Sequence, residues 1–366
     1  MGASMRRLAV LSGLAVAALL AAPASAAVYT PYFGDLHNHT SFSDGWEGTP
    51  LDAFLHADAS GADWLATSDH NFMLTQDEWS RTKAMADQAM TSSFVAMAAS
   101  EYWVTSGYGE VIVLNNDELR NKANFHPPRE ALSRHEVIGA FLDWLDAHAG
   151  AIGHWPHPGT YGDLDRLDGW SPAGDRVMSS IEVYNHGSFS QPAGAQTRDT
   201  EPWYVLALDK GWHVMPAAVS DTHSPDWISG SPARTVLLAT SLGRASLYAA
   251  LRNNRGYATI DENLRVSYTL NGAVMGSSLL PGTTGFTARI AASDPDGTSD
   301  RITSIEIVSD GGAVVASKAF SSPSVSWTVD LSSDRSRYYY VRITTASDPS
   351  GQPGTTAWTA PVWTGR

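Results

Sequence analysis

The sequence predicts an α/β, barrel-like domain followed by a small all-β domain. Two observations support this: apolar strands alternate with helical segments from about residue 28 to 260, and the helical period disappears after about residue 262. Because alternating strands and helices favour parallel pairing, we expect the first part to form an α/β barrel. The rest consists of short β-rich runs separated by turn residues, a pattern typical of an antiparallel sandwich.

In the first part, a β run at 32–39 is followed by a helix at 51–60, with Thr49 as its cap and Pro50 at its first position. The alternation then repeats. The further strands expected are 62–70, 94–103, 151–158, 179–186, 213–223 and 234–240, and the further helices are 77–90, 133–150, 201–211 and 244–254. The β runs of the second part are 264–272, 284–293, 302–312, 313–320, 324–332, 337–347 and 356–365.

The N-terminus has the features of a secretory signal peptide. Two arginines precede an apolar run at 8–22, and small residues at 24–26 offer a cleavage site. The run is shorter than the roughly 20 residues that a spanning helix needs. We therefore expect a soluble, secreted protein. The expected division is a leader at 1–26, a barrel at 27–261 and a β-sandwich at 262–366.

The net charge of −14 and the absence of cysteine narrow the class of protein. An acidic chain is a poor match for a nucleic-acid backbone or an anionic membrane surface, since both reward basic patches. Without cysteine, stability must come from the core and from bound metal rather than from disulfides. The chain also has no Gly-x-Ser-x-Gly nucleophile motif and no phosphate-binding loop. The expected partner is a small-molecule ester, and the oligomeric state stays open.

Candidate metal ligands gather at the carboxyl ends of the predicted strands. In barrels of parallel strands these ends meet at one rim, where active sites lie. Alternation along a strand also sends residues two apart to the same side. Mixed imidazole and carboxylate ligands suit zinc, manganese or iron. The candidates are His37, His39, Asp69, His70, Glu101, His154 or His157, His186, Asp221 and His223.

These motifs resemble those of the PHP metal-dependent phosphoesterases, named for polymerase and histidinol phosphatase. The matching runs, in order, are DLHNHTSFSDG, TSDHN, SEYW, HWPHPG, VYNHG and SDTH, between about 33 and 260. The β tail, with NGAVMGS and a closing YYYVRITT and AWTAPVW, is similar to the exported branch that includes carbaryl-hydrolase-type enzymes. The resemblance implies a distorted (β/α)7 barrel whose rim holds two or three divalent metal ions, of Zn, Mn or Fe.

The resemblance also implies how the ligands are shared. The first ion would be held by His37, His39, Glu101 and Asp221. Glu101 would bridge to a second ion, held also by His186 and by a histidine of HWPHP. Aligning the family's His-Pro selects His157 there, whereas counting from the apolar strand core allows His154.

A third ion would be held by Asp44, His70 and His223, with Asp44 where some relatives have histidine. The expected catalytic residues are Glu101, Asp221 and His223.

The expected function is hydrolysis of a phosphate mono- or diester by a metal-bound hydroxide. Arg198 and Arg234 are candidate contacts for a remaining phosphate oxygen, with a surface salt bridge as the alternative for each. Asp35 and Asp69 are candidates for accepting a ring N–H from a ligating histidine. Two other functions stay open: hydrolysis of a carboxylic or carbamate ester on the same metal site, and a non-catalytic, metal-scaffolded binding protein.

Overall fold

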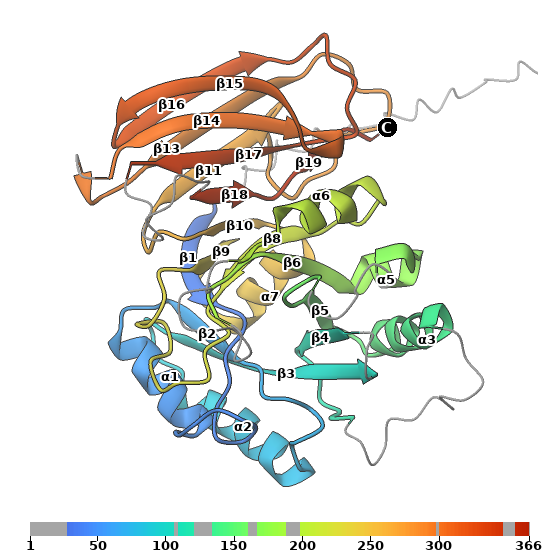
Figure 1. Ribbon diagram of the computed structural model, residues 1–366, viewed down its shortest axis with the longest axis vertical. Coiled ribbons are helices and arrows are strands. Elements are labelled where there is room, and N and C mark those ends of the chain that lie inside the picture. The colour runs from blue at the N-terminus through green and yellow to red at the C-terminus, as the bar shows by residue number, and fades with distance from the viewer. Residues whose placement is uncertain are drawn as a thin grey trace, which may run out of the picture.

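The computed structural model describes residues 28–105, 109–120, 134–159, 167–187, 198–297, 300–346 and 356–365. The predicted leader at 1–26 lies outside these residues. Figure 1 shows an α/β domain with a β domain above it. The predicted fold class is confirmed, since a mixed, largely parallel sheet with helices precedes a small antiparallel sheet. None of the helices in the described ranges has the length and hydropathy of a membrane span.

The α/β domain is built from ten strands and six helices of the described residues. Its strands are β1 (Thr30–Asp35), β2 (Trp64–Thr67), β3 (Val95–Thr105), β4 (Gly109–Leu114), β5 (Ile152–Trp155), β6 (Met178–Asn185), β7 (Arg198–Asp199), β8 (Met215–Val219), β9 (Arg234–Ala239) and β10 (Gly256–Thr259). Its helices are α1 (Pro50–Ala59), α2 (Gln76–Ala89), α3 (Arg134–Ala147), α5 (Pro172–Val177), α6 (Glu201–Asp209) and α7 (Arg244–Arg252).

Parallel pairing joins β1 to β2 and β2 to β3, and it also joins β5 to β6 and β6 to β8. The carboxyl ends of these six strands therefore face one rim. The expectation of wholly parallel pairing is wrong at β4, which runs antiparallel to both β3 and β5. Only residues 106–108 separate β3 from β4, and a connection this short can join only antiparallel strands. It is also wrong at β9 and β10, which pair antiparallel with β1 and with each other.

Local signals in the sequence set the first helix. The side chain of Thr49 accepts a hydrogen bond from the backbone N–H of Asp52, whose carboxylate accepts one from the backbone of Thr49 in return. Pro50 occupies the first turn, where its missing N–H has no intrahelical partner to lose. This capping box starts α1 at the expected residue and fixes where the preceding loop must end.

The β domain consists of two antiparallel sheets. Its strands are β11 (Arg265–Leu270), β12 (Ala273–Val274), β13 (Thr287–Ser293), β14 (Ile302–Ser309), β15 (Ala313–Ser322), β16 (Ser324–Asp330), β17 (Tyr338–Thr345), β18 (Ala357–Thr359) and β19 (Val362–Trp363), with a 3₁₀ turn at Asp310–Gly312. One sheet has the order β12-β11-β13-β16. The other contains β15-β14-β17-β18 and continues through β10 into the α/β domain.

Strand β18 links the two domains, as Figure 1 shows between β10 and β17. Trp358 of β18 pairs with Ala258 of β10 on one side and with Arg342 of β17 on the other. The apolar core is also shared, since one contiguous cluster contains Trp64 of the α/β domain and Ile305 of the β domain. The β domain therefore packs directly on the α/β domain.

A polar network reinforces this contact. Glu201, at the start of α6, accepts hydrogen bonds from the hydroxyl of Tyr340 and from Arg342, both in β17. The guanidinium of Arg342 lies 3.1 Å from the Glu201 carboxylate and 2.7 Å from that of Glu306. Glu201 is buried, so its loss leaves both donors poorly solvated.

We expect Glu201→Ala to lower the free energy of unfolding by about 2–3 kcal/mol, because a buried phenol and a half-buried guanidinium lose their acceptor. Urea unfolding of the mature chain measures this. The control is Glu47→Ala, an exposed position expected to change stability by less than about 0.5 kcal/mol. Equal stability of the two variants would contradict the assigned role of Glu201.

Candidate metal centre

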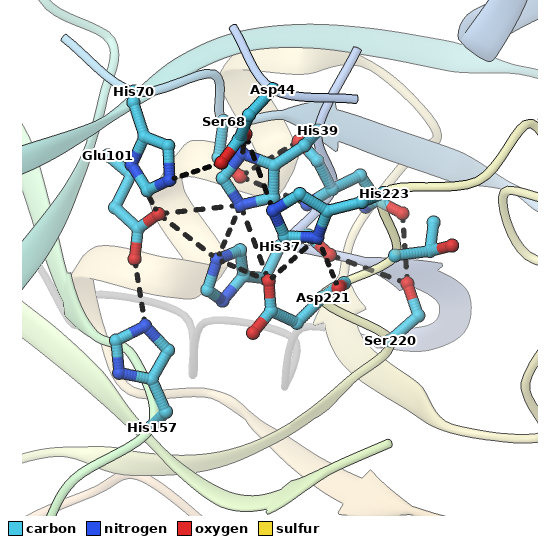
Figure 2. A network of polar contacts seen from close by, with 12 residues as sticks. His37, His39, Asp44, Ser68, His70, Glu101, His157, Ser220, Asp221 and His223 are labelled. Atoms are coloured by element: carbon cyan, nitrogen blue, oxygen red, sulfur yellow. Dashed lines mark hydrogen bonds and ion pairs between the residues drawn. The ribbon is translucent and has the colours of Figure 1, made fainter. Parts of the chain in front are cut away.

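The histidines at 37 and 39 follow β1 directly, and the pleat directs both toward the centre of the rim (Figure 2). The backbone N–H of Asp221 donates to the carbonyl of His37, and that of His39 donates to the carbonyl of Thr222. The chain after β1 is thus hydrogen-bonded to the chain after β8. These bonds hold the ligands of two strands at a fixed separation.

Four side-chain atoms converge at this point. The Nε2 atoms of His37 and His39 lie 3.1 Å apart. Oε2 of Glu101 lies 3.5 Å from the first and 3.4 Å from the second. Oδ1 of Asp221 lies 3.2 Å and 3.3 Å from the same two nitrogens. Four ligands placed tetrahedrally at about 2.1 Å from one ion are about 3.4 Å from one another, so the spacing fits a zinc-sized cation.

A second group of ligands lies on the other side of Glu101. Its Oε1 atom is 3.0 Å from Nε2 of His157, and the same nitrogen is 3.3 Å from Oε2 of Glu110. Potential ligand atoms of His37, His157 and Asp221 also lie within 4.8 Å of one another. The two oxygens of Glu101 thus face two different groups of ligands, which is the geometry of a bridging carboxylate.

A third group lies at the more exposed edge. Asp44 places Oδ1 3.3 Å from Nε2 of His223 and Oδ2 3.4 Å from Nε2 of His70. The Asp44 side chain is 37% exposed, whereas that of Glu101 is 1% exposed, so this edge is the open side of the centre. Gly45 lets the loop fold back here, because a Cβ at this position would lie 2.6 Å from the backbone of Thr40.

Glu182, on β6, orients the histidine at the middle of the centre. Its Oε1 atom accepts from Nδ1 of His37 at 2.8 Å, which leaves Nε2 of that ring free of its proton and directed at the four-atom group. The other oxygen, Oε2, accepts from Asn185 and from the backbone N–H of His157. Asn185 donates to Asp221 as well. One buried carboxylate therefore positions ligands from three strand ends.

The two aspartates expected to contact ring N–H groups have other partners. Asp35 accepts the backbone N–H groups of His37 and Ser220. Asp69 accepts from Thr40 and from the hydroxyl of Ser43, and that hydroxyl oxygen lies 3.4 Å from Nδ1 of His39. The expectation was therefore wrong for Asp35, and for Asp69 the contact with a histidine runs through Ser43.

The charge of the centre calls for cations. Glu101, Glu182 and Asp221 are buried, and within the described residues their ion pairs are with histidines alone. Burial opposes ionisation of Glu101, but the neighbouring charges of His37 and His70 outweigh it and hold its pKa well below the usual value. Oε2 of Glu101 also accepts no hydrogen bond from any described residue. A surplus of buried carboxylate oxygens beside imidazole nitrogens fits a divalent metal ion.

Burial likewise opposes the charged form of His157, yet its hydrogen bond to Glu101 prevails and raises the pKa to about 9. For Glu110, burial and the charge of Glu101 together raise the pKa to about 7. Histidines that bind protons this tightly compensate the same excess of negative charge that a metal ion would.

Some predicted site residues lie elsewhere. His154 points to Ser180 and Glu182, at 2.8 Å and 3.2 Å, and it belongs to none of the ligand groups found among the described residues. His186 is also absent from these groups and has Nδ1 3.4 Å from the hydroxyl of Tyr184.

The two predicted arginines differ in what the structure describes. The guanidinium of Arg234 is buried and donates to the carbonyls of Ser231 and Ala233, so it is engaged within the protein. The side chain of Arg198 lies outside the described residues.

Two residues of the centre were missed by the sequence analysis, Glu110 and Glu182. Each is an acidic residue within a strand whose neighbours are apolar, in GEVIVL and SSIEVYN. A carboxylate in such a run has a sequence signal, since charged side chains are seldom fully buried without a partner.

Comparisons with known proteins give a limited result. No known family model matches the chain, and no curated protein matches its sequence. A two-domain protein of Bacteroides vulgatus, which contains a predicted PHP-like metal-dependent phosphoesterase, is similar at 16% identity over 91% of this chain and 95% of its own, with a TM-score of 0.47. An amidohydrolase of Chromobacterium violaceum, with bound sulfate and no metal, is similar at 17% identity over 52% of this chain and 88% of its own, with a TM-score of 0.35. Likeness at this level leaves the function to be argued from the site.

Glu182→Gln is expected to lower metal affinity by roughly 10- to 100-fold, because an amide NH₂ would face donors that now share carboxylate oxygens. Competition with a chromophoric chelator measures the affinity. Glu306→Gln, in the β domain, is the control and should bind metal like the unchanged chain. An affinity for Glu182→Gln within twofold of the control would remove Glu182 from its positioning role.

We also expect His157→Ala to retain fewer metal ions per chain than His186→Ala, because only His157 lies against Glu101 and Glu110. Elemental analysis after dialysis against excess Mn or Zn gives both numbers. Equal losses in the two variants would show that His186 binds metal as the resemblance implies.

Proposed function

We propose that the chain is an exported, metal-dependent hydrolase, with phosphate ester hydrolysis as its best-supported activity. The observation that carries this proposal is the four-atom group formed by His37, His39, Glu101 and Asp221, whose spacing fits a tetrahedral cation. The bridging position of Glu101 supports two ions, and the Asp44 edge supports a third.

The assignment of ligands follows from the contacts. The first ion would be held by His37, His39, Glu101 and Asp221. The second would be held by Glu101, Glu110 and His157. The third would be held by Asp44, His70 and His223. With nitrogen and oxygen donors and no thiolate, we expect Zn, Mn or Fe. When bound, such ions supply Lewis acidity that stabilises charge on substrate oxygens and lowers the pKa of water.

The protein's own groups define where a substrate meets the centre. Asp44, His70 and His223 form the exposed edge, whereas Glu101, Glu182 and His37 are buried behind it. A substrate therefore approaches from the Asp44 side. Asn185 holds Asp221 by a hydrogen bond of 3.1 Å, and Glu182 holds His37, so these two ligands keep their orientation as a substrate arrives.

A specific observation favours an aromatic group in the substrate. The ring of Phe72 stacks on His70 with centroids 5.0 Å apart, and Trp103 packs edge-on against Phe72 at 4.9 Å. Trp103 is 39% exposed and Met73 is 42% exposed, so an apolar surface adjoins the open edge of the centre. This surface fits the aryl part of an ester. An aryl phosphate is our first candidate, and an aryl carbamate or carboxylic ester is the second.

The test is hydrolysis by the mature chain after chelation and reconstitution with Mn, Zn or Fe separately. Matched substrates share one naphthyl group and carry a phosphate monoester, a phosphate diester, a carbamate or a carboxylic ester. We expect the highest kcat/KM with a phosphate ester and no turnover without metal. Turnover of the carbamate or carboxylic ester alone would establish the second candidate. Failure on all four with metal bound would contradict both.

Replacing His37 and His39 together by Ala should lower kcat/KM by roughly 10³-fold or more, since several kcal/mol of charge stabilisation are lost. The control is His56→Ala, on α1, where the ring contacts Ser229 at 2.8 Å and lies outside the metal groups. Far-UV circular dichroism monitors folding of both variants. Full activity in the folded double variant after controlled remetallation would contradict the proposal.

Export is the remaining part of the proposal, and the leader pattern at 1–26 together with the absence of cysteine supports it. We expect the extracellular fraction to contain a chain that begins at or near Ala27. N-terminal sequencing tests this. Recovery of Met1 from that fraction would show that the leader is not removed.

A further inference from the structure

Three aspartates from different segments meet where the two domains join. Asp261 follows β10, the last strand of the α/β domain, whereas Asp294 follows β13 and Asp300 precedes β14 in the β domain. One carboxylate oxygen from each lies within 4.8 Å of the other two. None of these residues takes part in the metal centre described above.

Two of these carboxylates are buried without a basic partner. Asp261 is 7% exposed and Asp294 is 5% exposed, and among the described residues no lysine or arginine lies within 4.0 Å of either. Arg234 acts on Asp261 electrostatically, but its guanidinium is paired with Glu262 at 3.5 Å and with backbone carbonyls. Buried carboxylates without a counter-charge are costly, so something else must neutralise them.

The backbone fixes one oxygen of each buried carboxylate. Oδ1 of Asp261 accepts from the N–H groups of Asn263 and Leu264, and Oδ1 of Asp294 accepts from that of Asp296. Oδ2 of Asp294 is buried and accepts no hydrogen bond from any described residue. An oxygen held in place and left without a donor is available to a cation.

A further acceptor lies beside the three carboxylates. The Nδ2 group of Asn263 donates to both oxygens of Asp296, at 3.2 Å and 3.1 Å. Its Oδ1 atom is buried and has no hydrogen-bond partner among the described residues. The junction therefore offers an amide oxygen in addition to carboxylates.

The titration behaviour of Asp294 agrees with this geometry. Burial, followed by the negative charges of Asp261 and Asp300, raises the pKa of its carboxyl to about 7. The three groups repel one another when all are ionised, and a bound cation would remove that repulsion.

We propose that Asp261, Asp294 and Asp300 form a second kind of metal site, which binds a hard divalent cation and for which Ca²⁺ is the best match. All the donors are oxygens on loops, as calcium prefers, and no imidazole takes part. Mg²⁺ is a poorer match because it demands a tighter octahedral arrangement. Since Asp261 belongs to the segment leaving β10 and the other two to the β domain, the ion would tie the two domains together.

The test uses the full mature chain dialysed against about 1 mM Ca²⁺, a concentration suited to sites of extracellular modules. Elemental analysis of calcium, zinc, manganese and iron separates this site from the histidine-rich centre. We expect about one calcium per chain, lost in Asp294→Asn with the other metals unchanged. We also expect calcium to raise the melting temperature of the unchanged chain by roughly 3–8 °C relative to EGTA.

Asp330→Asn, at an exposed aspartate of β16, is the matched control and should retain the calcium and the shift. Equal calcium content in folded Asp294→Asn and Asp330→Asn would overturn the proposal. If Asp294→Asn does not fold, the unchanged chain still decides: no bound calcium, or a melting temperature that is the same in calcium and EGTA, would show that protons rather than a cation neutralise the three aspartates.

Discussion

The constraint on which the centre depends is the burial of Glu101, Glu182 and Asp221 beside histidines, with no lysine or arginine paired to them in the described residues. Carboxylates removed from water cost several kcal/mol each unless cations and hydrogen bonds compensate them. The hydrogen bonds are supplied by His37, Asn185 and the backbone of His157. Divalent ions would supply the remaining positive charge. A fold that buries these groups at one rim is therefore a fold that binding of metal stabilises.

The architecture meets this constraint through strand ends. Parallel strands deliver the ligands that follow β1, β2 and β8 to one rim, while antiparallel β4 brings Glu110 from the opposite direction. Backbone bonds between the chain after β1 and the chain after β8 keep the separation of the ligands fixed. At the opposite side of the sheet, β18 and the shared core attach the β domain. The two domains thus form one packed body in which the rim stays open at Asp44.

The sequence allowed much of this to be predicted, for identifiable reasons. His37, His39, Glu101 and Asp221 each close an apolar strand run, and the ends of parallel strands must converge, so their meeting followed from the pattern. The fold class followed from the alternation of strands and helices and from its loss after residue 262.

The rest depends on tertiary contacts that no local pattern specifies. Glu110 and Glu182 lie inside strands rather than at their ends, and β4 reverses direction after a short connection that the alternation of elements does not indicate. Choosing between His154 and His157 required the side-chain directions, because both lie in one short run. Asp35 lies next to a candidate ligand in sequence, but it bonds to the backbone, since two N–H groups point to its oxygens.

The central claim is that a cation lies between Nε2 of His37, Nε2 of His39, Oε2 of Glu101 and Oδ1 of Asp221. Anomalous diffraction from crystals of metal-reconstituted protein, recorded on either side of the Zn, Mn or Fe absorption edge, tests this most directly. The account predicts an anomalous peak within about 2.0–2.2 Å of all four atoms, together with a second peak near the other oxygen of Glu101. Crystals of reconstituted protein with the four side chains ordered and no anomalous peak among them would contradict it.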